Sequence, residues 1–492
     1  MTDRSETEAP APAGRLIEFD PGDLPGFYQA ASQVSGRDRS MSLGRIRLGP
    51  DVLDELVELV GARGRPDQVA VVMDDVAMSR AGQDLKPEVV RRLTQAGFNV
   101  RPLVLSDPHG LHTTAEQVAG LTQRLRAGDV VVSVGSGTIT DITKHAVHTF
   151  EQSNPGLALY HVAVATANSV GAYCSQLAVV TINGVKRTLP SRLPDCLILD
   201  TRILAETPRP YALGGVGDGA VGWCSLGDYR LASWCGLGHW EPLSPLVFLP
   251  GLQAFLDQDR SFTEGGLATA DAMARNLSAA GFVMSFAGES APASGLEHVT
   301  SHMLDMAADH HGRPIGNHGE QCGLATALVL LVYRYLLTEF DPTKIRASDL
   351  VVDWEAAERQ IGQVFDPLDP SGQMAQECWR DYSIKCQAWE DNRDQVLAVL
   401  ADWPARAREL SGLVADPERY IAALAATGHP LSFRDVPPGL PDDQVRWAFS
   451  HARLMRRRLS VADFLGFMGL WTDQLVDRLL AQFEELCHRH ST

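Results

Sequence analysis

The stretch VVVSVGSGTITDITKH, residues 130–145, decides the fold of this chain. A β-branched run ends in Gly135-Ser136-Gly137 and passes directly into a segment with helical spacing, which predicts a strand, a tight turn and a helix. Glycines let the backbone approach a diphosphate, and the first turn of the helix offers free N–H groups. Because a tight turn needs glycine whatever binds there, the motif alone suits a dinucleotide or a purely local turn.

The same alternation of short apolar runs and helical segments continues on both sides of this stretch. The other runs are VAVVMDD (69–75), NVRPLVL (99–105), HVAV (161–164) and DCLILD (195–200). Because parallel strands need long connections, this rhythm predicts an α/β domain with a parallel sheet and crossover helices. In LAVVTINGVKRTLP (177–190), two apolar runs flank Asn183-Gly184, which suits a two-residue turn and predicts an appended hairpin.

The periodicity changes along the chain and suggests its division into domains. After about residue 205 the apolar residues recur with helical spacing in long segments, so the second half is expected to be all-helical. Residues 1–38 mix acidic residues and prolines with short apolar pieces, which predicts a flexible leader. We therefore expect a leader over 1–38, an α/β domain over 39–204 and an all-helical domain over 205–492.

Composition narrows the class of function. The formal net charge of −18 leaves no broad basic surface for nucleic acid or anionic lipid, so a small-molecule partner is favoured. The eight cysteines form no CxxC pair, which is typical of reduced thiols. A polar N-terminus and the lack of an apolar run of about 18 residues predict a cytoplasmic protein without a membrane span.

Two sets of polar residues in the α/β half are candidates for cofactor binding. Asp74 or Asp75, at the end of an early strand, would accept hydrogen bonds from a ribose, although an acid in a surface turn is an equally good interpretation. The segment VATANSVGAYCS (164–175) carries Thr166, Ser169 and Ser175, whose hydroxyls would bond a cofactor. Serine and threonine are also common in loops for local reasons.

Histidines in the second half have the spacing of a metal site. His298 and His302 are four residues apart in a helical segment and project from one face, while His318 opens the next helix. Converging imidazoles suit a divalent first-row ion, although such pairs are often incidental. An open site needs a carboxylate as well, and Asp218 in GVGDG offers one, with helix capping as its commoner role.

Six motifs occur in an order that is typical of one known family. They are GSGTITDITKH (135–145), TANS (166–169) followed by Ser175, GVKRTLP (184–190), GVGDG (215–219), SGLEHVTSH (294–302) and NHGEQCGLAT (317–326). From about residue 40 to 475 the chain resembles the glycerol-1-phosphate dehydrogenases, particularly the bacterial AraM-like branch, within the dehydroquinate synthase-like and iron-containing alcohol dehydrogenase superfamily.

This resemblance implies a fold and a site. It implies an N-terminal Rossmann-like parallel-sheet domain, a C-terminal helical domain, an active site in the cleft between them, and a homodimer. It implies Asp218, His298 and His318 as ligands of one divalent metal, zinc or nickel or else iron, with His302 as a catalytic residue facing the substrate. The expected NAD or NADP site comprises Asp74, Gly135, Ser136, Gly137, Asp141, Thr166, Ser169 and Ser175.

The expected activity is the reduction of a ketone by NAD(P)H. The ion would polarise the carbonyl and the nicotinamide would deliver hydride to a small polar substrate, either a glycerol-phosphate-like compound or a polyol. Two alternatives are a lyase or cyclase of the dehydroquinate synthase type with transient use of NAD, and a non-catalytic descendant. Retention of all three expected ligands argues against the last.

The chain departs from the family at two positions. Relatives typically read S-x-D-G where this chain has Ser169-Val170-Gly171, so an acid is replaced by Gly171. A lysine four residues after the GVGDG aspartate is replaced by Gly222. Both changes remove polarity near the expected substrate, and a lost partner for a buried charge is costly. We therefore expect an altered substrate pocket.

Overall fold

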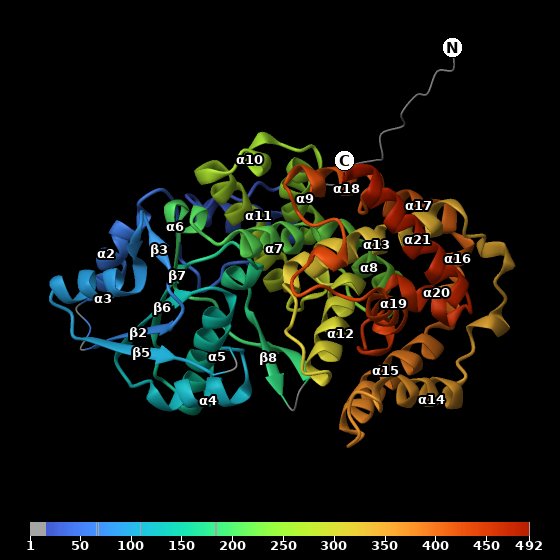
Figure 1. Ribbon diagram of the computed structural model, residues 1–492, viewed down its shortest axis with the longest axis horizontal. Coiled ribbons are helices and arrows are strands. Elements are labelled where there is room, and N and C mark those ends of the chain that lie inside the picture. Colours follow the sequence, from blue (N-terminus) through green and yellow to red (C-terminus); the bar gives the residue numbers. More distant parts are fainter. Residues whose placement is uncertain (1–15, 65, 67, 109, 183–184, 492) are drawn as a thin grey trace, which may run out of the picture. The chain divides into compact units, whose positions relative to one another are not determined.

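The computed structural model describes residues 16–64, 66, 68–108, 110–182 and 185–491 (Figure 1). Their contacts divide the chain into two compact units. We call Ile17–Gly219 with Val247–Ser290 the sheet unit. We call Ala220–Leu246 with the chain from Ala291 onward the helical unit.

A six-stranded sheet in the order β1-β10-β7-β6-β2-β5, with all neighbours parallel, is the core of the sheet unit. Its strands are β1 Arg45–Gly49, β2 Gln68–Asp74, β5 Val100–Leu105, β6 Asp129–Gly135, β7 Tyr160–Ala165 and β10 Cys196–Asp200. Every residue of β6 is buried, as expected for a strand covered on both faces. The predicted α/β fold with a parallel sheet is therefore confirmed.

Helices cover the two faces of this sheet. Apolar residues of α2 and α3 join one buried cluster with the sheet, and those of α4 and α5 join the other. The four helices are α2 Leu56–Gly61, α3 Leu85–Gln95, α4 Ala115–Arg124 and α5 Gly137–Ser153. The strand–turn–helix predicted around Gly135 is thus β6 followed by α5.

The predicted hairpin is present as a separate antiparallel pair. β8 Leu177–Ile182 pairs with β9 Val185–Pro190, although the turn at 183–184 lies outside the described residues. Asp141 of α5 accepts a hydrogen bond from the backbone N–H of Val179 at 3.1 Å, which attaches β8 to this helix. A shorter hairpin, β3 Ser79–Arg80 with β4 Gln83–Asp84, follows β2.

The sheet unit also contains helices that lie beyond residue 204. They are α6 Thr201–Ala205, α7 Arg209–Ala220, most of α9 Leu243–Leu256, α10 Arg260–Thr263 and α11 Gly266–Ala287. α11 packs against α6 and against the turn Gly171–Cys174 that follows β7. The secondary structure changes from strands to helices near residue 205, but the boundary between the two compact units lies elsewhere. The reason is that these helices pack within the sheet unit.

The expectation of a flexible leader over residues 1–38 needs correction. Residues 1–15 lie outside the described residues, but α1 Leu24–Ser35 is a helix capped by Asp23. Phe27 of α1 is buried, and its ring centroid lies 5.1 Å from that of Phe282 on α11. The short apolar pieces of this segment are thus the buried face of a helix, and their burial stabilises it.

The helical unit contains no strand among its described residues, which confirms the predicted all-helical second half. Its helices are α8 Gly222–Trp234, α12 Leu296–His310, α13 His318–Thr338, α14 Trp354–Phe365, α15 Gln373–Asp391, α16 Arg393–Ala401, α17 Trp403–Ser411, α18 Pro417–Ala426, α19 Asp442–His451, α20 Val461–Phe467 and α21 Asp473–His490. α13 is central, since it packs against α8, α12, α18, α20 and α21.

The sequence was expected to contain no long apolar run, and α13 is an exception. Within the described chain it is the one helix that has the length and apolar composition to cross a membrane. In its most apolar window, 78% of the residues are buried inside the protein. This is the pattern of a core helix.

Candidate functional site

Three imidazoles converge where α12 packs against α13. The ring centroid of His318 lies 5.2 Å from that of His298 and 5.3 Å from that of His302. Potential ligand atoms of His298, His318 and Cys322 all lie within 4.8 Å of one another. The predicted helical positions are correct, because His298 and His302 lie on α12 and His318 is the first residue of α13.

Neighbouring side chains hold the Nδ1 atoms of two of these rings. The Nδ1 of His298 lies 2.9 Å from a carboxylate oxygen of Glu297, which accepts its proton in a hydrogen bond. The Nδ1 of His318 lies 2.9 Å from the hydroxyl of Ser301, which itself donates to the amide oxygen of Gln321 at 2.7 Å. Each Nδ1 therefore carries a proton, and a metal would be bound through Nε2, as in metal-binding histidines with an oriented second nitrogen.

Glu297 is fully buried and ionised beside His298. Burial opposes its charge, but the hydrogen bond and charge of His298 and the backbone N–H of Gly295 lower the pKa of Glu297 below its usual value. Gly295 donates to this carboxylate at 2.6 Å, and the thiol of Cys224 donates at 3.2 Å. Glu297 thus fixes the ring of His298 and adds negative charge behind it, which favours a cation at Nε2.

A second group of possible ligands shares His318. Ligand atoms of His302, Asp305 and His318 also lie within 4.8 Å of one another, and both His302 and Asp305 are buried. Asp305 is three residues after His302 on α12, so both project toward the same side. The helical unit therefore offers two groups of possible ligands that share His318, one with the thiol of Cys322 and one with the carboxylate of Asp305.

Asp218 lies on α7, the helix that leaves the sheet unit. α7 ends at Ala220, the first residue of this part of the helical unit, and Asp218 stands two residues before that end. Its side chain is buried. The alternative of an N-capping aspartate is wrong, because Asp218 is in the last turn of a helix that begins at Arg209.

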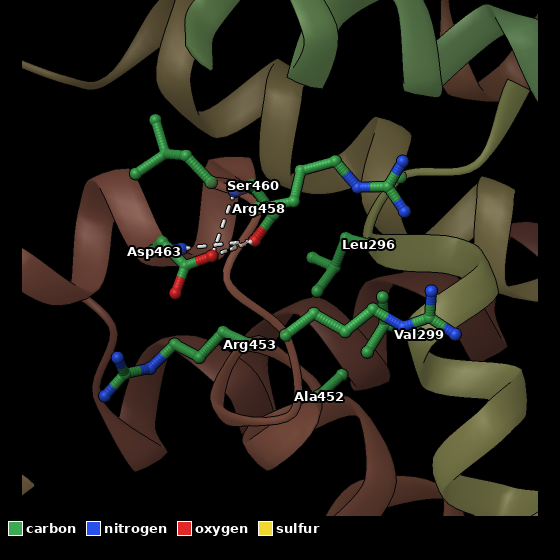
Figure 2. Close-up of a pocket in the computed structure, with 10 residues that line it drawn as sticks. Leu296, Val299, Ala452, Arg453, Arg458, Ser460 and Asp463 are labelled. Carbon is green, nitrogen blue, oxygen red and sulfur yellow. Dashed lines mark hydrogen bonds between the residues drawn. The ribbon is translucent and has the colours of Figure 1, made fainter. Parts of the chain in front are cut away.

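A small polar pocket lies at the start of α12. Figure 2 shows Leu296 and Val299 of α12 beside Arg453 and Arg458, and the reciprocal bonds between Ser460 and Asp463 that cap α20. The room left for a water-sized molecule is about 10 Å³. This is the space of one water, so the pocket is too small for a substrate.

In the sheet unit, the expected cofactor residues gather at the carboxyl edge of the sheet. The chain runs outward from β2 to β5 and then returns to β6, from which β7 and β10 continue in the other direction. Ligands of open α/β sheets bind at such a switch point. Asp74 ends β2 and Gly135 ends β6, so both lie at this point, and Thr166 donates its backbone N–H to the carbonyl of Gly135 at 3.1 Å.

Two features of this edge fit an anionic cofactor. Ser136 precedes α5 but its side chain makes no capping bond, and the first turn of α5 contains no acidic residue. The hydroxyl of Thr166 is buried and has no hydrogen-bond partner among the described residues. The turn therefore offers the N-terminus of a 17-residue helix and a buried hydroxyl beside it.

Other expected cofactor residues have structural partners. Asp74 bonds to Lys86 and accepts the backbone N–H of Val76 at 2.9 Å. The carboxylate of Asp141 contacts Lys144 at 2.9 Å and the N–H of Val179, and the hydroxyl of Ser175 accepts the N–H of Leu177 at 3.1 Å. Ser169 is half-buried in the same loop. Cofactor contacts of Asp74, Asp141 and Ser175 stay predictions, and all three also have local structural roles.

The glycines of these motifs are required by close packing. A Cβ on Gly137 would lie 2.5 Å from the side chain of Val170. A Cβ on Gly215, in the GVGDG motif, would lie 1.7 Å from the backbone oxygen of Asn168. Both glycines allow the loop after β7 to lie against its neighbours, whatever that loop binds.

Gly171 has a similar explanation. A Cβ at this position would lie 2.9 Å from the backbone oxygen of Leu277 and 3.2 Å from the backbone nitrogen of Gly281, both on α11. A Cβ on Gly281 would in turn lie 2.5 Å from the oxygen of Gly171. The two glycines therefore let α11 and the Gly171 turn meet backbone to backbone, where an aspartate side chain has no room.

Comparisons with known proteins agree with this fold. Residues 47–208 match the family model described as iron-containing alcohol dehydrogenase. Among curated proteins, the glycerol-1-phosphate dehydrogenase [NAD(P)+] of Bacillus subtilis is 29% identical over 424 residues, covering 84% of this chain and 88% of its own length. The namesake from Halalkalibacterium halodurans is 29% identical, covering 60% and 71%. The chain is thus similar to glycerol-1-phosphate dehydrogenases over most of its length and, in part, to iron-containing alcohol dehydrogenases, which confirms the resemblance.

Solved structures support the fold alone. The glycerol dehydrogenase of Schizosaccharomyces pombe has a TM-score of 0.51 at 14% identity, covering 89% of this chain and 90% of that one. The maleylacetate reductase of Rhizobium sp. strain MTP-10005 has a TM-score of 0.51 at 17% identity, covering 87% and 96%.

Sequence reasoning missed several residues around the imidazole cluster. Glu297 and Ser301 orient the rings, and Cys322 faces His318. Cys322 follows His318 by four residues, so its spacing on one helix face was a usable signal. Glu297 is the direct neighbour of His298, and adjacent helical residues do not usually face each other, so spacing gave no signal for that bond.

Proposed function

We propose that this chain is a metal-dependent NAD(P)H oxidoreductase that reduces the ketone of a small polar substrate. The observation that carries the proposal is the pair His298 and His318, each with its Nδ1 bonded to a neighbouring side chain, so that both rings would bind a metal through Nε2. The glycine turn after β6 and the curated relatives supply the second support, because those relatives are named for NAD(P)+ and glycerol 1-phosphate.

We propose Asp218, His298 and His318 as the protein ligands of one divalent ion, with zinc or nickel preferred and iron possible. Imidazole nitrogens and a carboxylate are suitable donors for these ions. A bound ion would supply Lewis-acid polarisation of the substrate carbonyl. Glu297 and Ser301 would hold the two imidazoles in place, which keeps their Nε2 atoms directed at one point.

The remaining residues bind, orient and transfer a proton. Gly135, Ser136 and Gly137 would hold the cofactor diphosphate against the first turn of α5, and Thr166 would donate its hydroxyl. His302 would face the substrate and pass a proton to its oxygen, since an imidazole titrates near neutral pH. Asp74, Asp141, Ser169 and Ser175 would complete the wall of the NAD or NADP site.

The substrate is proposed to differ from glycerol 1-phosphate. Gly171 provides no side chain, and α11 fills the space that an aspartate there would need. Gly222, the first residue of α8, replaces the family lysine. A ketone with fewer charged groups, or a larger one, is therefore the proposed substrate. We further propose a cytoplasmic homodimer.

The test is metal analysis of the purified chain together with NADH and NADPH oxidation against a panel of ketones that includes dihydroxyacetone phosphate. Wild-type protein should contain stoichiometric metal, and H298A and H318A should each lose it. Activity in both variants should fall by at least about a thousandfold, because a metal contributes several kcal/mol to such a transition state.

The exposed His310 gives a matched control, since H310A removes an imidazole from the end of the same helix. It should leave both metal content and activity unchanged. Stoichiometric metal in H298A and H318A would refute the site, and the absence of any NAD(P) binding would favour a non-catalytic descendant. Fast turnover of dihydroxyacetone phosphate would refute the proposed substrate alone.

A further inference from the structure

We infer that Cys322 is an additional ligand of the metal centre, so that a thiolate binds the ion together with His298 and His318. The inference rests on the metal site proposed above and adds a residue that the family motif does not assign. It concerns three side chains of the helical unit, all on α12 or α13.

The distances fit a shared ion. The sulfur of Cys322 lies 3.7 Å from Nε2 of His318, and the ligand atoms of His298, His318 and Cys322 lie within 4.8 Å of one another. Tetrahedral zinc with Zn–S of about 2.3 Å and Zn–N of about 2.0–2.1 Å separates sulfur from nitrogen by about 3.5 Å. The observed spacing is close to this value, so one ion could contact both atoms with little movement.

The helix explains why the thiol faces the ring. Cys322 follows His318 by four residues on α13, so both project from one face of the helix. All eight cysteines are buried, but only Cys322 joins a group with metal-ligand spacing in the described part of the chain. A cysteine that only fills the core has no need of this position beside the imidazoles.

A thiolate ligand would change the chemistry of the centre. On binding the ion the thiol loses its proton to solvent, so metal uptake would release one proton at Cys322. Soft sulfur favours zinc over magnesium or manganese. Added to the three ligands proposed above, Cys322 would be a fourth protein donor, so a substrate oxygen would bind the ion as a fifth ligand.

The experiment uses the full chain, stripped of metal with a chelator and titrated with Co²⁺. Visible d–d bands report that cobalt is bound, and an intense near-ultraviolet charge-transfer band reports a cobalt–sulfur bond. The wild-type protein should show both signals. C322S should retain the d–d bands and lose the charge-transfer band, while Zn²⁺ affinity should fall by at least about tenfold.

The matched control is C378A, which removes another buried cysteine of the helical unit. It should keep both optical signals. X-ray absorption of the wild-type zinc protein adds a measurement that needs no variant, and it should find one sulfur at about 2.3 Å.

The outcomes separate the two proposals. Cobalt bound with d–d bands but without charge transfer in the wild-type protein would overturn the role of Cys322 and leave the metal centre intact. A charge-transfer band that persists in C322S would also overturn it. Failure of the wild-type protein to bind cobalt or zinc would refute the metal centre and, with it, this inference.

Discussion

The imidazole cluster of the helical unit and the glycine turns of the sheet unit differ in what their motif residues contact. In the cluster, the polar atoms of Glu297 and Ser301 hold the Nδ1 atoms of His298 and His318, so that the Nε2 atoms of both rings face the cluster's ligand group. In the turns, Asp74 and Asp141 are engaged by lysines and backbone N–H groups, and Gly215 is required by a backbone contact.

The difference teaches how to interpret a family motif. Histidines that bind a metal usually have their second nitrogen held by a hydrogen bond, and His298 and His318 combine this feature with a place in a group of possible ligands. A glycine in a Gly-rich segment is often explained by what packs against it. The same level of motif matching therefore gives stronger evidence for chemistry in the helical unit than in the sheet unit.

The largest test of this comparison concerns Gly215. G215A places a Cβ 1.7 Å from the backbone oxygen of Asn168, so the loop after β7 must move. We expect the free energy of unfolding to fall by about 3 kcal/mol or more, with weaker cofactor binding through Thr166. Urea unfolding and NADH titration measure these effects.

Gly120 provides the matched control for that substitution. It lies in α4, and a Cβ there meets nothing within 4 Å, so G120A should stabilise the protein by up to about 1 kcal/mol. Equal stability of G215A and wild type would contradict the packing explanation of the GVGDG motif.

An intermediate effect is expected for the residues that orient the imidazoles. E297Q keeps the shape of the side chain but removes the negative charge behind His298, and S301A removes the partner of His318. Each should raise the metal dissociation constant on the order of 10–100-fold. Competition with a chromophoric chelator gives these constants, and unchanged values in both variants would show that the rings need no such orientation.

Near neutral pH, the smallest expected effect is a pH dependence that arises in the sheet unit. Burial, aided by the charges of Arg192 and Lys144, lowers the pKa of His161 to about 3. His161 is therefore protonated near pH 6.5 in the unfolded chain, whereas in the folded chain it stays neutral until the pH is much lower. The contribution of His161 is complete above pH 6.5 and is lost as the pH falls from there toward 3, by about 1.4 kcal/mol per pH unit.

H161L should flatten this part of the stability profile, and urea unfolding between pH 4 and 7 measures it. The same substitution at exposed His310 serves as the control and should leave the profile unchanged. An identical slope in H161L and wild type would mean that the slope comes from other groups.

Much of the fold followed from local patterns, while the exceptions depend on distant partners. The runs that became β2, β6 and β10 are buried on both faces or nearly so, and such strands are visible as continuous apolar stretches. The helix α1 was missed because its apolar face is short and gains its stability from Phe282, more than two hundred residues later.

For the site, the sequence by itself determined the positions of His298, His302 and His318 on two helices, because helical spacing is a local property of the chain. Only the tertiary structure decided that Ser301 meets His318 and that α11 closes the space beside Gly171. Such contacts depend on how helices pack, and packing joins residues whose separation along the chain carries no information about their distance.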